Sequence, residues 1–297
     1  MMKKIAVIGA GTMGNGIAHT FAQNGCEVSL IDISEDSLKY GINTIERNLN
    51  RMVEGDKLSL EQMQSTLDNI KSFDILSDGL AGVDMVIEAA TENVEVKMKL
   101  FSQLDEICED HVILATNTSS ISITKLAAIT KRAPQVIGMH FMNPVPVMKL
   151  VEVIRGGETS DEVTQKVMQC AKDLQKIPVE VLDYPGFVAN RILMPMINEA
   201  IYTLHEGVSG VLEIDTVMQL GMAHPMGPLH LADFIGLDVC LSILQVLQDG
   251  FGSSKYAPCP LLVNMVDAHK LGVKTGEGFY DYSKGIKSKK VSRPFVK

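Results

Sequence analysis

The chain has 297 residues, 46% of them apolar and 21% charged, which is enough to bury sizeable cores in two domains. The formal net charge of −9 argues against nucleic acid as the main partner, because phosphate backbones bind to basic surfaces. The five cysteines are scattered, without a CxxC or a metal-type pairing with histidine, so we expect free thiols, a cytoplasmic location and no bound metal. No apolar run approaches the roughly 18–20 residues of a membrane span, and no signal peptide is predicted.

The first half of the chain alternates short apolar runs with helical patterns. Apolar runs predict strands at 5–9, 27–32, 83–90, 111–118, 135–141 and 148–156. Helices are predicted at 13–24, from the N-cap Ser34 to about Glu54, at about 95–108 and at 122–128. Continuous Val, Ile and Leu runs separated by helices are typical of a parallel sheet covered on both faces. The predicted fold class is therefore α/β, with a doubly wound, mostly parallel sheet.

The pattern changes at Pro185-Gly186, so we place a domain boundary near residue 184. Residues 185–297 read as an all-α domain with helices at 187–206, 213–220, 228–249 and 260–270. These helices are more apolar than one small bundle requires, which predicts a homodimer formed through this domain. The basic end of the chain, 284–297, is predicted to be a frayed tail rather than a functional arm.

A glycine-rich loop, GAGTMG at 9–14, lies between the first strand and the first helix. In this Rossmann-type context its glycines and the free N–H groups of the helix N-terminus form a site for a pyrophosphate. Asp32 ends the next strand, where a carboxylate accepts hydrogen bonds from an adenosine ribose and repels a 2′-phosphate. NAD is therefore favoured over NADP. The predicted loop contacts are Gly9, Gly11, Thr12, Met13 and Gly14.

Polar residues follow two further strands, at the sheet edge where ligands of such folds bind. Asn117 and Ser119 lie in the turn ATNTSS, while Glu92 and Lys97 lie at the start of the helix predicted at 95–108. Ser119 could contact a ligand or cap the helix at 122–128, and both interpretations stay open. For Ser122 we prefer the helix-capping role.

The stretch GMHFMNPVPVMKLVEVIRG, residues 138–156, is mostly apolar yet carries His140, Asn143 and Glu152. A histidine can take up the proton released when a secondary alcohol is oxidised, and a carboxylate behind it can fix its ring. His140 and Glu152 lie on consecutive predicted strands that could bring them into contact. A lone histidine in an apolar strand is more often structural, so the residues alone leave both roles open.

The segments GAGTMG, EAATENVEVK, NTSSISI, GMHFMNPVPVMKLVEVI, PGFVANRI, HPMGPL with DFIGLD, and KTGEGFYDY occur in this order over residues 3–283. Together they resemble the L-3-hydroxyacyl-CoA dehydrogenase family, and within it the stand-alone bacterial 3-hydroxybutyryl-CoA dehydrogenases. The resemblance implies an oxidoreductase that uses NAD to interconvert a 3-hydroxyacyl-CoA and a 3-ketoacyl-CoA. An acyl-CoA is thus the implied substrate.

The same resemblance implies individual roles. His140 matches the catalytic histidine of the family and Glu152 its acidic partner, while Ser119 and Asn190 match the residues that contact the substrate oxygen. Arg51 falls where relatives place a lysine that faces the CoA phosphates, and arginine can also bind phosphate. The positions that match cofactor contacts are Glu92, Lys97, Asn143 and Lys274, to which the polar turn adds Asn117 and Ser119.

Three alternatives stay open at this point. A related two-domain dehydrogenase acting on another hydroxy acid would share the glycine loop and helical domain without needing the His140–Glu152 arrangement. A binding protein without enzymatic activity could use the same scaffold, although the intact polar residues argue against it. An enzyme that prefers NADPH and runs in the reductive direction is opposed only by Asp32.

Overall fold

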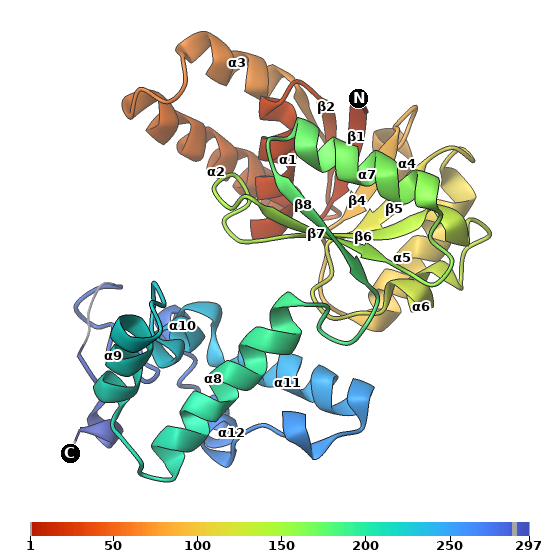
Figure 1. The fold of residues 1–297 in the computed structure, drawn as a ribbon. Coiled ribbons are helices and arrows are strands. Elements are labelled where there is room, and N and C mark those ends of the chain that lie inside the picture. Colours follow the sequence, from red (N-terminus) through yellow and green to blue (C-terminus); the bar gives the residue numbers. More distant parts are fainter. Residues whose placement is uncertain (1, 287–289, 297) are drawn as a thin grey trace. The chain divides into compact units, whose positions relative to one another are not determined.

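The computed structural model describes residues 2–286 and 290–296 of the chain. By its internal contacts the chain divides into two compact units, Met1–Tyr184 and Pro185–Lys297. The first unit contains the sheet with its covering helices, and the second is built mainly from helices (Figure 1). These features confirm the predicted α/β class with a helical C-terminal part.

The first unit is built on one eight-stranded sheet in the order β3-β2-β1-β4-β5-β6-β7-β8. Neighbouring strands are parallel except β6 and β7, which are antiparallel. The chain moves outward from β1 to β3 and then crosses to β4, so the carboxyl ends of β1 and β4 border the crevice where such sheets bind ligands. The strands are β1 (Lys4–Ile8), β2 (Glu27–Ile31), β3 (Ile70–Phe73), β4 (Met85–Glu88), β5 (Ile113–Thr116), β6 (Val136–Phe141), β7 (Leu150–Arg155) and β8 (Ile177–Leu182).

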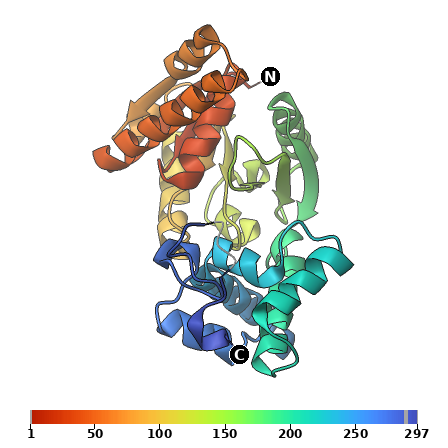
Figure 2. The same ribbon diagram turned by 90° about the vertical axis from the view of Figure 1, so that its left-hand side faces the viewer.

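Most helices of the first unit begin at a residue whose side chain caps the helix. Ser34 Oγ accepts a hydrogen bond from Ser37 N at the start of α2, and Ser122 caps α6 in the same way, both as predicted. Figure 2 shows α2 and α3 side by side as a hairpin. The helices are α1 (Thr12–Gln23), α2 (Glu35–Glu54), α3 (Leu60–Asp68), α4 (Leu76–Gly79), α5 (Val94–Ile107), α6 (Ile123–Ala127) and α7 (Asp161–Asp173), with the 3-10 turn η1 (Ala133–Gln135).

The main core of the first unit lies between the sheet and the helices α1, α2 and α7. Phe21 of α1 and Phe141 of β6 meet edge to face there, with ring centroids 6.4 Å apart. The crossover from β4 to β5 runs in the opposite direction along the sheet, so the right-handed rule puts α5 on the other face. Phe101 and Leu104 of α5 are fully buried. Both faces of the sheet are thus covered, as the continuous apolar strands predicted.

The sequence patterns did not predict α3, β3, α4, α7 or β8. The strands β3 and β8 lie at the two edges of the sheet, and most of their residues are partly or fully exposed, so neither forms a continuous apolar run. The helix α3 did carry a signal: Ser59 and Gln62 form a reciprocal capping box at its start.

The second unit contains five α-helices and several 3-10 turns within its described residues. The single helix predicted at 228–249 is wrong, because Gly236, with a φ of +102°, separates two helices that bend by 97°. No single helix in the described part of the chain is long and apolar enough to cross a membrane. The helices are α8 (Ala189–His205), α9 (Val211–Gly221), α10 (Pro228–Ile235), α11 (Leu237–Phe251) and α12 (Pro260–Asp267), with η2 (Ser254–Tyr256), η3 (Val273–Thr275) and η4 (Arg293–Phe295).

The last described segment, 290–296, packs against the rest of the second unit. Val291 forms a β-bridge with Tyr280, and the ring of Phe295 lies against that of Phe279 with centroids 5.7 Å apart. The expectation of a frayed tail is therefore wrong for this segment, because two apolar side chains among the charges anchor it to the helical core. The other residues of the predicted tail, 287–289 and 297, lie outside the described residues.

The buried histidine of α1, His19, predicts a loss of stability in acid. Its side chain is fully buried, and burial lowers its pKa from 6.5 to about 4. Between these values the unfolded chain binds a proton that the folded chain does not, so stability falls as pH falls through this range. We expect His19 to contribute a loss of about 2 kcal/mol in the free energy of unfolding between pH 7 and pH 5.

Urea unfolding of wild type and His19→Gln at the two pH values measures this contribution. The variant should lose less stability between pH 7 and pH 5 than wild type. His111→Gln serves as the control, because the side chain of His111 is 57% exposed. Equal losses in wild type and His19→Gln would contradict the assignment.

Candidate active site

The glycine loop follows β1 and opens α1 as predicted. Gly9 has a φ of +97°, and a Cβ on it would lie 2.7 Å from the carbonyl oxygen of Ala89. A Cβ on Gly14 would lie 1.7 Å from the carbonyl oxygen of Gly9, so packing within the unit requires both glycines. A Cβ on Gly11 would meet no protein atom within 4 Å. Internal packing therefore does not explain why residue 11 is a glycine, whereas the close approach of a ligand to the backbone does.

The first turn of α1 has the features of an anion site. No side chain caps it, and no acidic residue lies in it. The amides of Thr12, Met13 and Gly14 have no acceptor within the helix, because the first bond of the ladder runs from Asn15 N to Gly11 O. Free amides and the helix dipole together favour a phosphate group at this position.

Asp32 follows β2 beside the glycine loop. Its Oδ2 accepts a hydrogen bond from Ala10 N at 2.8 Å, and its Oδ1 accepts one from Ser34 N at 2.9 Å. Each carboxylate oxygen therefore has one fixed donor and can accept a further hydrogen bond. With the free amides of α1 and the open space beside Gly11, this carboxylate fits the requirements of a dinucleotide.

His140 and Glu152 lie directly opposite each other on β6 and β7. The distance from His140 Nδ1 to Glu152 Oε2 is 2.8 Å, and both side chains are buried, so the predicted contact is confirmed. The sequence neighbours of both residues, including Met139 and Val153, pack into the core with α1 and α7. Because side chains alternate along a strand, His140 and Glu152 point to the opposite face of the sheet.

Two asparagines lie near the ends of β5 and β6. Asn117 Oδ1 accepts a hydrogen bond from Phe141 N at 2.8 Å, which ties the turn after β5 to the residue after His140. Asn143 is exposed at the start of the loop between β6 and β7. The predicted cofactor contacts of both residues stay predictions.

The turn that carries Ser119 is held by Glu92. Glu92 Oε1 accepts hydrogen bonds from Thr118 Oγ1 at 2.6 Å, from Ser119 N at 2.9 Å and from Ser119 Oγ at 3.2 Å. Ser120 Oγ donates to the same oxygen at 3.1 Å. Ser119 is not the cap of α6, since Ser122 has that role. Of the two interpretations left open for Ser119, the capping role is therefore wrong.

A buried ion pair lies behind this turn, and its acidic member was not among the predicted site residues. Lys97 Nζ lies 2.6 and 2.7 Å from the two carboxylate oxygens of Glu88, and both side chains are fully buried. Thr116 Oγ1 donates to Glu88 Oε2 at 2.7 Å. An acidic residue ending an apolar strand could have indicated Glu88, because the carboxyl ends of strands are where ligands bind.

Two predicted site residues, Asn190 and Lys274, belong to the second unit. Asn190 is buried in the first turn of α8. Lys274 lies in η3 and forms an ion pair with Asp238 of α11, beside the break at Gly236. Their predicted contacts with substrate and cofactor stay predictions.

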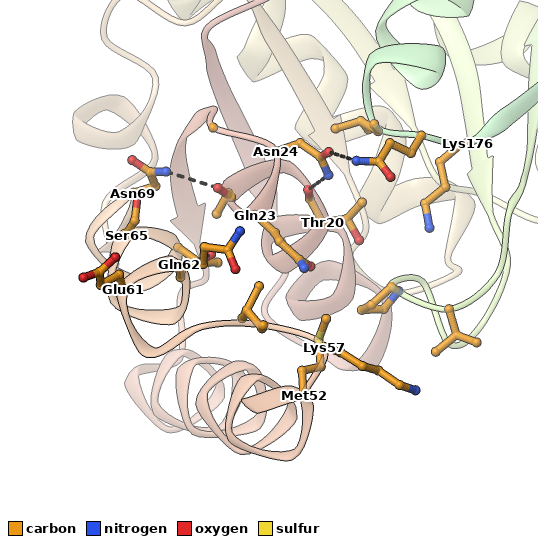
Figure 3. Close-up of a pocket in the computed structure, with 18 of the residues that line it drawn as sticks. Thr20, Gln23, Asn24, Met52, Lys57, Glu61, Gln62, Ser65, Asn69 and Lys176 are labelled. Carbon is orange, nitrogen blue, oxygen red and sulfur yellow. Dashed lines mark hydrogen bonds between the residues drawn. The ribbon is translucent and has the colours of Figure 1, made fainter. Parts of the chain in front are cut away.

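Arg51 is exposed in the last turn of α2. Close to this turn lies a pocket of about 640 Å³, bounded by the end of α1, the α2–α3 hairpin and the turn before β8. Figure 3 shows the side chains of Gln23, Gln62 and Lys176 among those that line it. Lys57 and Lys149 also line the pocket, and the sequence patterns did not single them out.

The sheet, the glycine loop and Asp32 define a dinucleotide-binding protein of the Rossmann type. The profile for the NAD binding domain of 3-hydroxyacyl-CoA dehydrogenase matches residues 4–184, and the profile for the C-terminal domain of this enzyme matches residues 186–282. The chain therefore belongs to the 3-hydroxyacyl-CoA dehydrogenase family and is an NAD-type dehydrogenase. Among the described residues, no cluster of His, Cys, Asp or Glu is arranged to hold a metal ion.

Individual relatives match over nearly the whole chain. The chain is 54% identical to the 3-hydroxybutyryl-CoA dehydrogenase of Bradyrhizobium diazoefficiens, over 95% of this chain and 96% of that protein. It is 53% identical to a probable 3-hydroxybutyryl-CoA dehydrogenase of Bacillus subtilis, over 95% of this chain and 98% of that protein. The crystal structure of (S)-3-hydroxybutyryl-CoA dehydrogenase from Ralstonia eutropha superposes with a TM-score of 0.92 at 50% identity, covering 95% of this chain and all of that one.

Proposed function

We propose that this protein interconverts (S)-3-hydroxybutyryl-CoA and acetoacetyl-CoA with NAD as its coenzyme. The observation that carries the proposal is the buried contact of 2.8 Å between His140 Nδ1 and Glu152 Oε2, which supplies an oriented acid–base group. The relatives named 3-hydroxybutyryl-CoA dehydrogenase, at 53% and 54% identity, support this substrate class.

In the oxidative direction, His140 takes the proton of the 3-hydroxyl group. Glu152 accepts the Nδ1–H, which directs Nε2 toward the substrate and stabilises the imidazolium that forms. Ser119 and Asn190 position the 3-oxygen, and Asn190 can also polarise the thioester carbonyl. A bound NAD would supply the acceptor for the hydride of C3. In the reductive direction, His140 returns the same proton to the 3-oxygen.

The geometry of the first unit supports the proposed coenzyme contacts. The amides at the start of α1 face the pyrophosphate, and Asp32 accepts hydrogen bonds from the adenosine ribose. We assign Glu92, Lys97, Asn117, Ser119 and Asn143 of the first unit, and Lys274 of the second, to the remaining coenzyme contacts. The negative charge of Asp32 selects NAD over NADP.

A substrate panel tests the proposal. The rate of NADH oxidation is measured with acetoacetyl-CoA, with longer 3-ketoacyl-CoAs, and with free acetoacetate and other keto acids that lack CoA. Acetoacetyl-CoA should have a higher kcat/KM than any of the acids. A preference for an acid without CoA would instead support the alternative of a hydroxy-acid dehydrogenase, and turnover of none of them would support a binding protein.

We assign binding of the CoA phosphates to exposed cations near the turn between α2 and α3. Arg51 lies there, and Lys57 adds a second exposed cation that lines the pocket of Figure 3. Because exposed charge pairs contribute about 0.2–1 kcal/mol, Arg51→Ala and Lys57→Ala should each raise the KM for acetoacetyl-CoA about two- to fivefold without lowering kcat. Acetoacetyl-N-acetylcysteamine, a thioester without phosphates, is the control, and its KM should stay constant. A KM for acetoacetyl-CoA that is unchanged in both variants would contradict this assignment.

We also propose a cytoplasmic homodimer formed through the second unit. The helix α9 and its flanks expose Val208, Val217, Leu220 and Met222, next to an apolar pocket of about 430 Å³ lined by α8 and α9. Light scattering at micromolar concentration should give twice the chain mass of 32.4 kDa, and Leu220→Glu should lower it. Leu60→Glu, at an exposed position in the first unit, is the control. A wild-type monomer would refute the dimer.

A further inference from the structure

A buried carboxylate in the helical core of the second unit takes no part in the proposed reaction. Asp233 of α10 is 1% exposed. Its Oδ1 accepts a hydrogen bond from Phe279 N at 3.0 Å. Its Oδ2 accepts hydrogen bonds from Tyr280 N at 2.9 Å and from the hydroxyl group of Tyr282 at 3.1 Å. All three donors belong to one short segment, 279–282, so Asp233 fastens this segment to α10.

The turn just before this segment, 272–278, carries Lys274 in η3. Its two ends are joined to each other, because Gly272 N donates a hydrogen bond to Glu277 O at 2.9 Å and the two residues form a β-bridge. The ammonium group of Lys274 forms an ion pair with Asp238 at the start of α11. The turn is thus closed on itself, and the position of its ends determines where Lys274 lies.

Both ends of this turn rest directly on Asp233. A Cβ on Gly272 would lie 2.3 Å from the carbonyl oxygen of Asp233, and a Cβ on Gly278 would lie 1.9 Å from its Oδ1. Gly272 also has a φ of +91°, which residues other than glycine rarely adopt. The two glycines therefore bring the turn closer to Asp233 than residues with side chains could.

A second buried carboxylate, Asp215 of α9, braces this arrangement. Its Oδ1 accepts a hydrogen bond from Leu229 N at 2.9 Å. Its Oδ2 accepts hydrogen bonds from His230 N at 3.0 Å and from the hydroxyl group of Tyr280 at 2.7 Å. Leu229 and His230 lie in the first turn of α10, the helix that carries Asp233. Asp215 thus fixes both the helix that provides Asp233 and the segment that Asp233 holds.

We propose that Asp233 is a positioning residue for coenzyme binding, which acts through the 272–278 turn to keep Lys274 where it contacts NAD. The inference rests on the proposed function, because the contact of Lys274 with the coenzyme is part of that proposal. Displacing the turn from Asp233 would weaken this contact and leave the pair of His140 and Glu152 unchanged, since that pair lies on β6 and β7 of the first unit. The loss of a contact that binds ground state and transition state equally raises KM without lowering kcat.

Gly278→Ala tests this proposal, because it moves the turn away from Asp233 without changing the side chain of Asp233 or of Lys274. The Kd of NADH, measured by fluorescence, should rise at least about threefold, while kcat for acetoacetyl-CoA reduction at saturating NADH changes less than about twofold. Lys274→Ala should raise this Kd at least about fivefold. The rise in Gly278→Ala should not exceed the rise in Lys274→Ala, because the first variant acts through the second residue. If Gly278→Ala does not fold, as judged by circular dichroism, Tyr282→Phe removes one hydrogen bond to Asp233 instead and should raise the Kd at least about twofold.

Two controls separate positioning from a general loss of stability. Gly157→Ala makes the same substitution in the first unit, where a Cβ would lie at ordinary contact distances of 3.4 and 3.6 Å from Thr124. Asn198→Ala destabilises the second unit elsewhere, because the buried amide of Asn198 binds the backbone of Ala257 and Cys259. Asn198→Ala should lower the melting temperature, yet the Kd of NADH should change less than about twofold in both controls.

A double-mutant cycle decides whether the effect passes through Lys274. In the Lys274→Ala background, Gly278→Ala should change the Kd of NADH less than about twofold, because the contact that it displaces is already gone. An equal rise in both backgrounds, or no rise in the wild-type background, would overturn the positioning role of Asp233 and leave the proposed function intact. An unchanged Kd in Lys274→Ala alone would refute the coenzyme contact of Lys274, and this inference with it. NADH binding needs no substrate, so the cycle still tests the inference if wild type does not reduce acetoacetyl-CoA and the proposed function fails.

Discussion

His140→Ala should lower kcat for acetoacetyl-CoA reduction at least about 100-fold, in line with general acid–base contributions of about 10²–10⁴. The variant removes the group that we assign to transferring the proton of the 3-oxygen. Because His140 lies on β6 and the glycine loop follows β1, the Kd of NADH should stay close to that of wild type. Steady-state kinetics together with a fluorescence titration of NADH measure both quantities.

His111→Ala is the control for this experiment, since it removes an exposed histidine outside the candidate site. A variant of His140 that keeps wild-type kcat would refute the acid–base assignment. Glu152→Gln adds a second check, because it leaves a hydrogen-bonding side chain but removes the charge behind the ring. It should lower kcat and shift the pH–rate profile, and an unchanged profile would make Glu152 structural.

Wild-type protein should use NADH with a kcat/KM at least about 100-fold higher than NADPH. Placing a 2′-phosphate beside the carboxylate of Asp32 juxtaposes two negative charges, which costs several kcal/mol, and about 1.4 kcal/mol corresponds to a factor of ten. The backbone amides of Ala10 and Ser34 hold this carboxylate at 2.8 and 2.9 Å, so it cannot simply turn away.

Asp32→Asn keeps the shape of the side chain and removes its charge. The ratio of kcat/KM for NADH over NADPH should then fall at least about tenfold. Asp36→Asn makes the same change on the exposed first turn of α2 and should leave the ratio unchanged. The coenzyme assignment fails if wild type uses NADPH with the higher kcat/KM.

The sequence predicted those parts of the fold in which burial requires a continuous run of apolar residues. The strands β1, β2, β4, β5, β6 and β7 are mostly or fully buried and read as apolar runs. The edge strands β3 and β8 are mostly exposed or partly exposed, so they do not read as apolar runs and were not predicted. Gly236 was read as part of a helix, because a sequence pattern does not reveal that this glycine adopts a φ of +102°.

In the candidate site, motifs singled out individual residues but did not predict how their side chains are connected. The spacing of the glycines and Asp32 predicted the phosphate loop, and consecutive strands predicted the contact of His140 with Glu152. The link from Glu88 through Lys97 and Glu92 to Ser119 joins two strand ends and a helix start. Such a link depends on side-chain directions in three elements at once, which no local pattern encodes.

The antiparallel pairing of β6 with β7 has a consequence for the order in which the protein is assembled. His140 and Glu152 are only twelve residues apart, and the register of one hairpin places them opposite each other. An N-terminal domain generally folds first during synthesis. His140 and Glu152 can therefore be paired by the register of β6 and β7 once β8 is complete, while most of the helical unit is still being made.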